Sequence, residues 1–289
     1  MIAERTRYTF PNTTETEPGW LSPSQVTEWL RCPACYELSR IRKLPRPLSV
    51  NLPIGSALHK AVEEARLGNL NVHQSIETAA DWFDKETSQP TDEETGQPLD
   101  ILEIDLGTKY SDLGQVKDEV VRLAEFTVPR ILKLDAQRGK LAATEWNLSY
   151  LESPWPFTVH GRLDAIFVDY LADASKPELA TVMADLKSSS KQQEPDEFTA
   201  IAQTIYQLYW SSRGLPLAVL ADVVSKAKEP SLQTYALVGD DDSRKLTYDT
   251  VMQVADSISA GRFPPHPNWS CSYLHGFSEF KAAATGFPE

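Results

Sequence analysis

Residues 161–167 have the sequence GRLDAIF and residues 184–191 have the sequence ADLKSSSK, and these two stretches decide the fold. Their polar and apolar residues alternate with a period of two, which is typical of β-strands. In an extended chain Asp185 and Lys187 project to one face. If the two strands are neighbours in a sheet, we expect Asp164 and Asp185 to lie a few ångströms apart.

Two carboxylates that are held together repel each other and are costly to bury, and a divalent cation offsets that cost. Mg²⁺ and Mn²⁺ prefer oxygen ligands and bind one or two carboxylates together with phosphate oxygens of a substrate. The ammonium group of Lys187 could orient an attacking water and stabilise a pentacoordinate phosphate. The combination favours phosphodiester hydrolysis, whereas either stretch alone is common at exposed strand edges.

The remainder of the chain predicts helices before these strands and a mixture of strands and helices after them. Apolar residues at helical spacing predict helices over 22–36 (interrupted near Pro33), 55–66, 72–85, 115–138 (kinked at Pro129), 196–213 and 247–260. Period-two patterns predict strands over 142–150, 157–167, 180–186, 217–224 and 232–238. Because strands and helices do not strictly alternate, we expect an α/β chain with a mixed sheet.

These elements predict four parts of the chain. Residues 1–20 form a flexible arm, and residues 21–140 form a helical N-terminal part with a mobile acidic insertion over 86–110. Residues 141–262 form the core sheet with its helices, and residues 263–289 form an extended tail.

Composition limits the classes of function. The 289 residues are 41% hydrophobic and 24% charged, which is ordinary for a globular protein. The net charge of -13 excludes a polycation that coats nucleic acid, but it does not exclude a DNA enzyme whose phosphate contacts lie in one groove. The apolar runs are too short to cross a bilayer, the first twenty residues lack a secretory h-region, and three cysteines fit a reducing compartment. We therefore expect a cytoplasmic protein, bacterial or in a phage-infected host, with no membrane partner.

A basic run lies at 39–46, where four cations occur within eight residues without an acid. Its members are Arg40, Arg42, Lys43 and Arg46. A solvated surface run is the common explanation of such a cluster. In an acidic protein these side chains are also candidate contacts to DNA phosphates.

Two further segments of the sequence carry motifs in addition to the two predicted strands. Residues 21–38 (LSPSQVTEWLRCPACYEL) form a candidate opening helix, and residues 55–65 (GSALHKAVEEA) place His59 and Glu63 one helical turn apart. Together the four ordered segments resemble the PD-(D/E)XK nuclease superfamily in its RecB-like branch, which includes CRISPR-adaptation (Cas-four-type) exonucleases and phage recombination nucleases. The resemblance spans about residues 21–224. It implies a restriction-endonuclease-like core, in which helices flank a mixed central sheet.

The resemblance also implies roles for individual residues. His59, Asp164 and Asp185 would be the metal ligands, although a histidine on a helix surface is by itself more often only solvated. The two aspartates would be catalytic together with Lys187 and with Gln203, which matches the glutamine of the family's Gln-x-x-x-Tyr helix. Further candidates for DNA contacts are Arg162 and Tyr206, with Tyr209 as the alternative tyrosine.

The implied cofactor is Mg²⁺ or Mn²⁺. Some relatives bind a [4Fe–4S] cluster, for which this chain offers Cys32, Cys35 and Cys271, with His275 nearby. Because a cluster normally takes four thiolates, we do not expect one, and zinc binding by the same groups has no better support.

The implied function is an exonuclease in recombination, repair or replication of phage or bacterial DNA, and its partners would be DNA ends and a helicase or recombinase. Two alternatives stay open, namely an inactive nuclease-like module that binds DNA ends or a partner, and an acidic protein that mimics DNA. The intact set of acids and lysine favours the enzyme.

Overall fold

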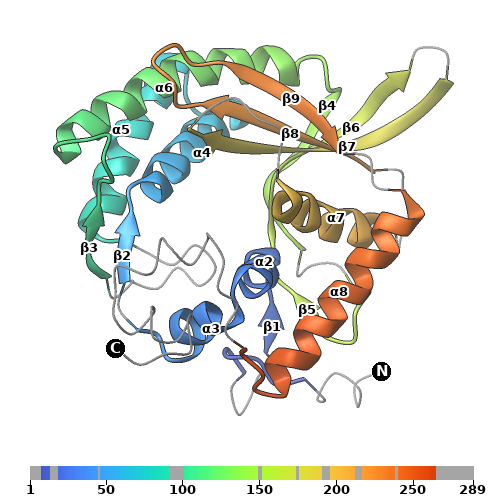
Figure 1. The fold of residues 1–289 in the computed structure, drawn as a ribbon. Coiled ribbons are helices and arrows are strands. Elements are labelled where there is room, and N and C mark those ends of the chain that lie inside the picture. The colour runs from blue at the N-terminus through green and yellow to red at the C-terminus, as the bar shows by residue number, and fades with distance from the viewer. Residues whose placement is uncertain are drawn as a thin grey trace.

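A mixed sheet of five strands forms the centre of the molecule (Figure 1). The computed structural model describes residues 8–13, 19–44, 46–90, 101–148, 152–173, 176–190, 196–211, 217–237 and 240–264. In spatial order the strands are β4 (Lys140–Asn147), β6 (Arg162–Asp173), β7 (Lys176–Ser189), β8 (Leu217–Ser225) and β9 (Leu232–Leu237). The β7–β8 pair is parallel and the other neighbouring pairs are antiparallel. The predicted mixed sheet is confirmed.

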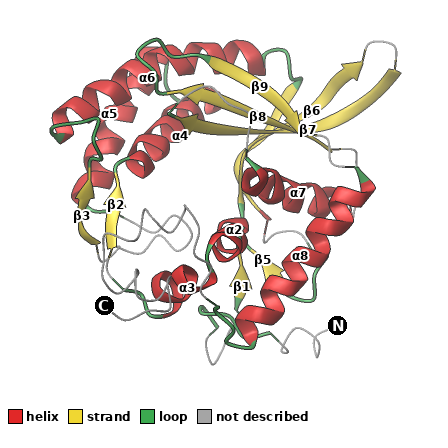
Figure 2. Cartoon of the chain, in the orientation of Figure 1, coloured by secondary structure: helices red, strands yellow, loops and turns green. Residues whose placement is uncertain are grey.

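Helices cover both faces of the sheet (Figure 2). One layer contains α4 (Asn51–Leu67), α5 (Val72–Ser88) and α6 (Leu113–Asp135). Its apolar side chains pack with Leu186 of β7 and Val224 of β8. The other layer contains α2 (Pro23–Arg31), α7 (Glu197–Ser211) and α8 (Asp241–Ser259), which pack with Leu163 of β6 and Val219 of β8. The central strands β7 and β8 therefore present apolar residues to both helical layers, so the middle of the sheet is buried between them.

The N-terminal helix begins and ends where the sequence predicts. The Ser22 hydroxyl accepts a hydrogen bond from the backbone N–H of Gln25 at 3.0 Å, and Pro23 occupies the first helical turn. The helix ends at Arg31, because Pro33 lacks the N–H that would continue it, and α3 (Pro33–Tyr36) begins there. The π-helix η1 (Glu37–Ile41) follows.

Two predicted flexible regions contain ordered parts. In the arm, Tyr8 and Phe10 are buried, and their rings lie 5.0 and 5.4 Å from that of Phe157, because aromatic packing buries apolar surface. In the insertion predicted over 86–110, α5 extends through Ser88 and a strand, β3 (Ile101–Asp105), pairs with β2 (Arg46–Ser49). At these residues the structure has buried rings and regular elements where the sequence predicts a flexible arm and a mobile insertion. Residues 91–100 and the tail from 265 lie outside the described part.

A second short parallel pair joins β1 (Trp20–Leu21) to β5 (Thr158–Val159), so the entry to α2 is held beside the start of β6. None of the helices in the described ranges is long and apolar enough to span a membrane.

Candidate active site

Three carboxylates lie side by side across adjacent strands. In the pairing of β4 with β6, Thr144 lies opposite Ala165 and Trp146 lies opposite Leu163. Glu145 and Asp164 therefore occupy opposed positions on the two strands. The β6–β7 register pairs Ala165 with Ala184, so Asp185 occupies the position opposite Asp164 on the other side. Like charges directly opposite each other destabilise a sheet, so this row of three carboxylates is stable only with a positive charge nearby.

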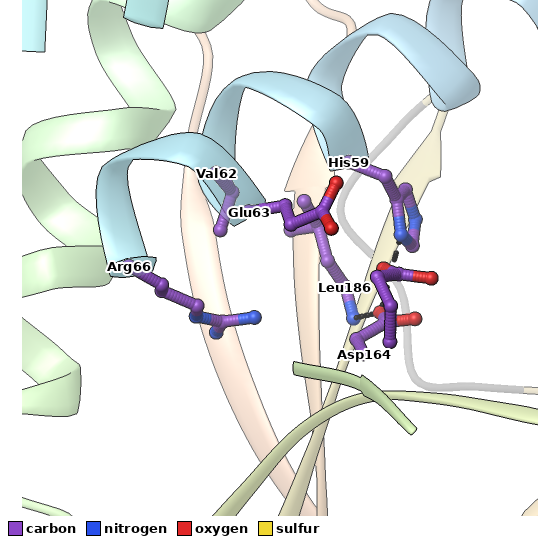
Figure 3. A pocket seen from close by; sticks show the side chains of 7 residues that line it. His59, Val62, Glu63, Arg66, Asp164 and Leu186 are labelled. Carbon is purple, nitrogen blue, oxygen red and sulfur yellow. Dashed lines mark hydrogen bonds and ion pairs between the residues drawn. The ribbon is translucent and has the colours of Figure 1, made fainter. Parts of the chain in front are cut away.

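A histidine from the helical layer joins the row of acids. His59 lies on α4, next to the buried stripe that contains Leu58 and Val62, and its Nδ1 is 3.3 Å from Asp164 Oδ2 (Figure 3). Ligand atoms of His59, Glu145 and Asp164 all lie within 4.8 Å of one another, so the three residues could hold a metal ion. One imidazole nitrogen and two carboxylates suit a divalent cation that keeps further positions for water or substrate oxygens.

The electrostatics of these groups show how closely they interact. Burial lowers the pKa of His59, but the adjacent Asp164 carboxylate outweighs this effect and raises it to about 9. Burial raises the pKa of Asp164, yet His59 and the hydrogen bond from the Leu186 N–H, at 2.7 Å, hold it well below its usual range. Burial and the negative charge of Asp164 raise the pKa of Glu145 to about 7. Ionised Glu145 is therefore unfavourable without a cation.

Asp185 binds two other side chains instead of joining this group of three. Its Oδ1 accepts a hydrogen bond from Lys187 Nζ at 2.9 Å, and its Oδ2 accepts one from Gln203 Nε2 at 2.8 Å. Burial lowers the pKa of Lys187, but Asp185 and Asp164 outweigh that effect and raise it above the usual range, so the side chain is an ammonium. The Lys187 side chain is 46% exposed, whereas Asp185 is 7% exposed. Asp185 thus anchors a cation that faces solvent.

The site is a small pocket between α4 and the sheet. Figure 3 shows the side chains that line it, which are His59, Val62, Glu63, Arg66, Glu145, Asp164 and Leu186. Glu63 accepts a hydrogen bond from Lys60 at 2.8 Å, and Arg66 Nε donates one to Asp135 at 2.8 Å. Glu63 therefore lies beside the site, as the helical spacing predicts, and it is bound to a neighbouring lysine.

Of the two candidate tyrosines, one lies near the site and the other lies in the core. The Tyr206 hydroxyl donates to the carbonyl oxygen of Arg162 at 3.4 Å. Tyr209 is fully buried, and its hydroxyl donates to the Val159 carbonyl at 3.2 Å. A Cβ at Gly161 would lie 3.0 Å from the Tyr206 ring, so glycine permits this close approach. The Arg162 guanidinium is 61% exposed and lies 3.6 Å from Glu145.

The basic run is only partly available for DNA. Arg40 is paired with Glu28 at 2.8 Å, and Arg42 is paired with Glu37 at 2.8 Å, because acids from α2 and η1 lie beside them in the fold. Lys43 is exposed, and the Arg46 side chain lies outside the described part. Arg40 and Arg42 therefore each have an acidic partner that lies outside the run, and their contact with DNA stays a prediction.

Two of the candidate cluster ligands lie in the part of the chain that the structure describes. Cys32 and Cys35 are both buried, and the Cys35 N–H donates to Cys32 Sγ at 3.3 Å. Cys271 and His275 lie outside the described residues.

Glu145 is the site residue that sequence reasoning missed. It lies within the strand predicted over 142–150, but no spacing pattern connects it to the later motifs. Its backbone has a φ of 48°, which is uncommon for a residue other than glycine. Such conformations occur often where a side chain is aimed into a functional site. Only the register between β4 and β6 reveals its place beside Asp164.

One comparison with known proteins identifies the family. A model of the PD-(D/E)XK nuclease superfamily matches residues 20–273. No curated protein matches the chain. Among solved structures, the chain is similar to a crystal structure from Eubacterium rectale described as "Putative exonuclease". The identity is 12%, the TM-score is 0.48, and the match covers 89% of this chain and 94% of the other.

Proposed function

The chain belongs to the PD-(D/E)XK nuclease superfamily, and from this premise we propose that it is a divalent-metal-dependent deoxyribonuclease. We further propose that it acts as an exonuclease on DNA ends during recombination, repair or replication. One observation gives the proposal its main support. Ligand atoms of His59, Glu145 and Asp164 lie within 4.8 Å of one another, next to the Lys187–Asp185 pair on the neighbouring strand.

The donor set fits Mg²⁺ or Mn²⁺. Two opposed carboxylates and an imidazole would hold the ion, and Asp185 lies at the next sheet position. A bound cation would offset the repulsion that raises the pKa of Glu145 to about 7. When bound, it would supply the Lewis acid that polarises a phosphodiester and lowers the pKa of water.

The chain's own residues would then position the substrate and stabilise charge. The Lys187 ammonium, fixed at 2.9 Å from Asp185, would stabilise negative charge that develops on the phosphate oxygens. Gln203 holds the other oxygen of Asp185, so it would act as a positioning residue for the acid–lysine pair. The exposed Arg162 guanidinium would bind a phosphate of the strand.

Degradation of end-labelled DNA with Mg²⁺ and with Mn²⁺ tests the proposal. Wild type should degrade the DNA, and Asp185→Ala and Lys187→Ala should lose activity at least a hundredfold. Lys245→Ala, which removes an exposed lysine of α8, is the matched control and should keep full activity. If wild type is as inert as the two site variants, the enzyme proposal is wrong.

A second comparison tests the exonuclease assignment. Linear DNA with free ends, linear DNA with blocked ends and closed circles are offered separately, each as single and double strands. An exonuclease degrades only the substrates with free ends. Equal cleavage of closed circles would show an endonuclease instead.

A further inference from the structure

A stacked pair of aromatic rings lies at the start of β6, the strand that carries Asp164. The indole of Trp20, from β1, and the imidazole of His160 have ring centroids 4.4 Å apart and planes inclined by 9°. Both residues are only half-buried, so the pair lies at the surface of the molecule. Stacked rings at a surface are the kind of group on which a flat ligand packs.

The pairing of β1 with β5 directs these two rings away from the core. The two strands lie side by side and parallel, with Leu21 opposite Val159 (Figure 1). Leu21 and Val159 are both buried in the apolar cluster that α2, α7 and α8 cover. Because successive residues of an extended chain point to opposite faces, Trp20 and His160 project to the other side.

The same alternation places the pair on the face of β6 that carries the candidate metal site. A Cβ at Gly161 would lie 3.0 Å from the ring of Tyr206, so this position faces the helical layer that contains α7. The residues on either side of it, His160 and Arg162, therefore project to the opposite face. Asp164, two residues beyond Arg162, shares that face.

Three kinds of group thus follow one another along one face of the chain. His160, Arg162 and Asp164 succeed each other at intervals of two residues, or about 7 Å. The stacked rings suit a base, and the Arg162 guanidinium, which is 61% exposed and 3.6 Å from Glu145, suits a phosphate. The order along the chain is therefore that of a nucleic-acid strand that leads into the site.

The distance from the rings to the acid fits the same strand. From His160 to Asp164 the extended chain covers about 13 Å. One strand of a duplex advances about 3.4 Å per nucleotide, so this distance spans about four nucleotides of a duplex and fewer of an extended single strand. The pair is near enough to contact the strand that is cut and too far to touch the reacting phosphate.

The position of Trp20 is fixed without any ligand. The Asn12 side chain accepts a hydrogen bond from the Trp20 N–H at 2.9 Å and donates one to the Trp20 carbonyl at 3.0 Å. A Cβ at Gly19 would lie 2.2 Å from Thr13 Oγ1, so glycine permits this close approach of the two segments. A ring that is already held in place loses little conformational entropy when a base packs on it.

We propose that Trp20 and His160 form a stacking platform for an unpaired base, and that this platform makes the site prefer single-stranded DNA to duplex. The inference rests on the proposed function for the class of ligand. The faces of a base within a duplex are covered by its neighbours, whereas those of an unpaired base are accessible. Because every base has such a face, the platform contributes strand preference without reading sequence.

Anisotropy of fluorescent strands in EDTA tests this inference without cleavage. One strand is a single-stranded oligonucleotide, and the other is an abasic strand of the same length, which keeps the phosphates and lacks the bases. Wild type should bind the intact strand about tenfold more tightly than the abasic one. Equal binding of the two strands by wild type would overturn the inference without the use of any variant.

Trp20→Ala should weaken binding of the intact strand about tenfold and leave binding of the abasic strand unchanged. Trp20→Phe keeps a ring and should recover most of the affinity. The slope of log Kd against log salt should stay that of wild type, because no phosphate contact is lost. A tryptophan that only supports the fold would weaken binding of both strands alike.

Tyr235→Ala is the matched control, since it removes a half-exposed ring from β9 at the other edge of the sheet, and it should bind as wild type does. A blunt duplex of the same length measures the strand preference, which Trp20→Ala should reduce about tenfold. If Trp20→Ala fails to fold, His160→Gln decides by the same pattern. Equal losses on intact and abasic strands, or on single strands and duplex, would overturn the inference.

Failure of this inference differs from failure of the proposed function. A wild type that binds intact strands with this ring dependence but never cleaves them in Mg²⁺ or Mn²⁺ would contradict the proposed function alone. A wild type that cleaves DNA, with folded ring variants that bind the intact strand normally, would contradict this inference alone.

Discussion

Replacement of Glu145 by Gln should stabilise the protein without metal and weaken its response to metal. The substitution keeps the shape of the side chain and removes the charge opposite Asp164. Burial and that neighbour raise the pKa of Glu145 from 4.5 to about 7. A carboxyl whose pKa is higher in the folded state binds its proton more tightly there, so the folded state loses stability as the pH rises from 4.5 through 7.

The size of the effect follows from the same shift. Each pKa unit corresponds to 1.36 kcal/mol, so ionised Glu145 costs roughly 3 kcal/mol of folding free energy at pH 8 in the absence of metal. The side chain is 24% exposed, so solvent screens little of this cost. Glu145→Gln should therefore raise the Tm in EDTA at pH 8 by a few degrees. At pH 4.5 wild type is protonated at this position, and the difference should vanish.

Calorimetry in EDTA and in Mn²⁺ measures both effects. Wild type should gain stability with Mn²⁺, since a ligand that binds only the folded state stabilises it, and Glu145→Gln should lose most of that gain. Glu125→Gln, an exposed position on α6, is the control and should follow wild type in every condition. Equal Tm values at pH 8 in EDTA, or an undiminished gain with Mn²⁺ in the variant, would refute the reasoning.

Three more predictions concern other parts of the chain. His59, with its pKa raised to about 9 by Asp164, must lose a proton to bind metal, so calorimetric Mn²⁺ affinity should fall about tenfold per pH unit between pH 9 and 7, and more steeply below 7, where Glu145 is protonated as well. The pair it forms with Asp164 stabilises the metal-free protein below about pH 6.5 and is lost as the pH rises through 9, which an NMR titration of the imidazole would detect. Lys187→Ala should reduce DNA cleavage at least a hundredfold and leave Mn²⁺ affinity unchanged, because its role is to stabilise charge on the substrate; weaker metal binding would count against that role. Arg138→Ala should destabilise folding by about 3 to 5 kcal/mol in a denaturant titration, because it leaves the fully buried Asp222 carboxylate unpaired, and a loss under 1 kcal/mol would contradict that account.

The sequence by itself determined most of the elements and the local placement of the candidate site residues. Ser22 and Pro23 start the first helix, and the alternating stretches become β6 and β7, because caps, prolines and period-two patterns act locally. Helical spacing placed His59 and Glu63 on the face of α4 that meets the sheet. These signals lie within a few residues of the features they specify, so no knowledge of distant contacts was needed.

Only the tertiary structure decided which charged groups meet. Glu145 reaches Asp164 through the register of β4 against β6 and through an unusual backbone conformation, neither of which has a local pattern. Arg40 is neutralised by Glu28 from another helix, so a run that looks cationic in sequence is partly paired in space. Asp185 is held by Lys187 and by Gln203 of α7. Electrostatic interactions depend on distance and burial rather than on separation along the chain, and packing of the sheet between its helical layers sets both.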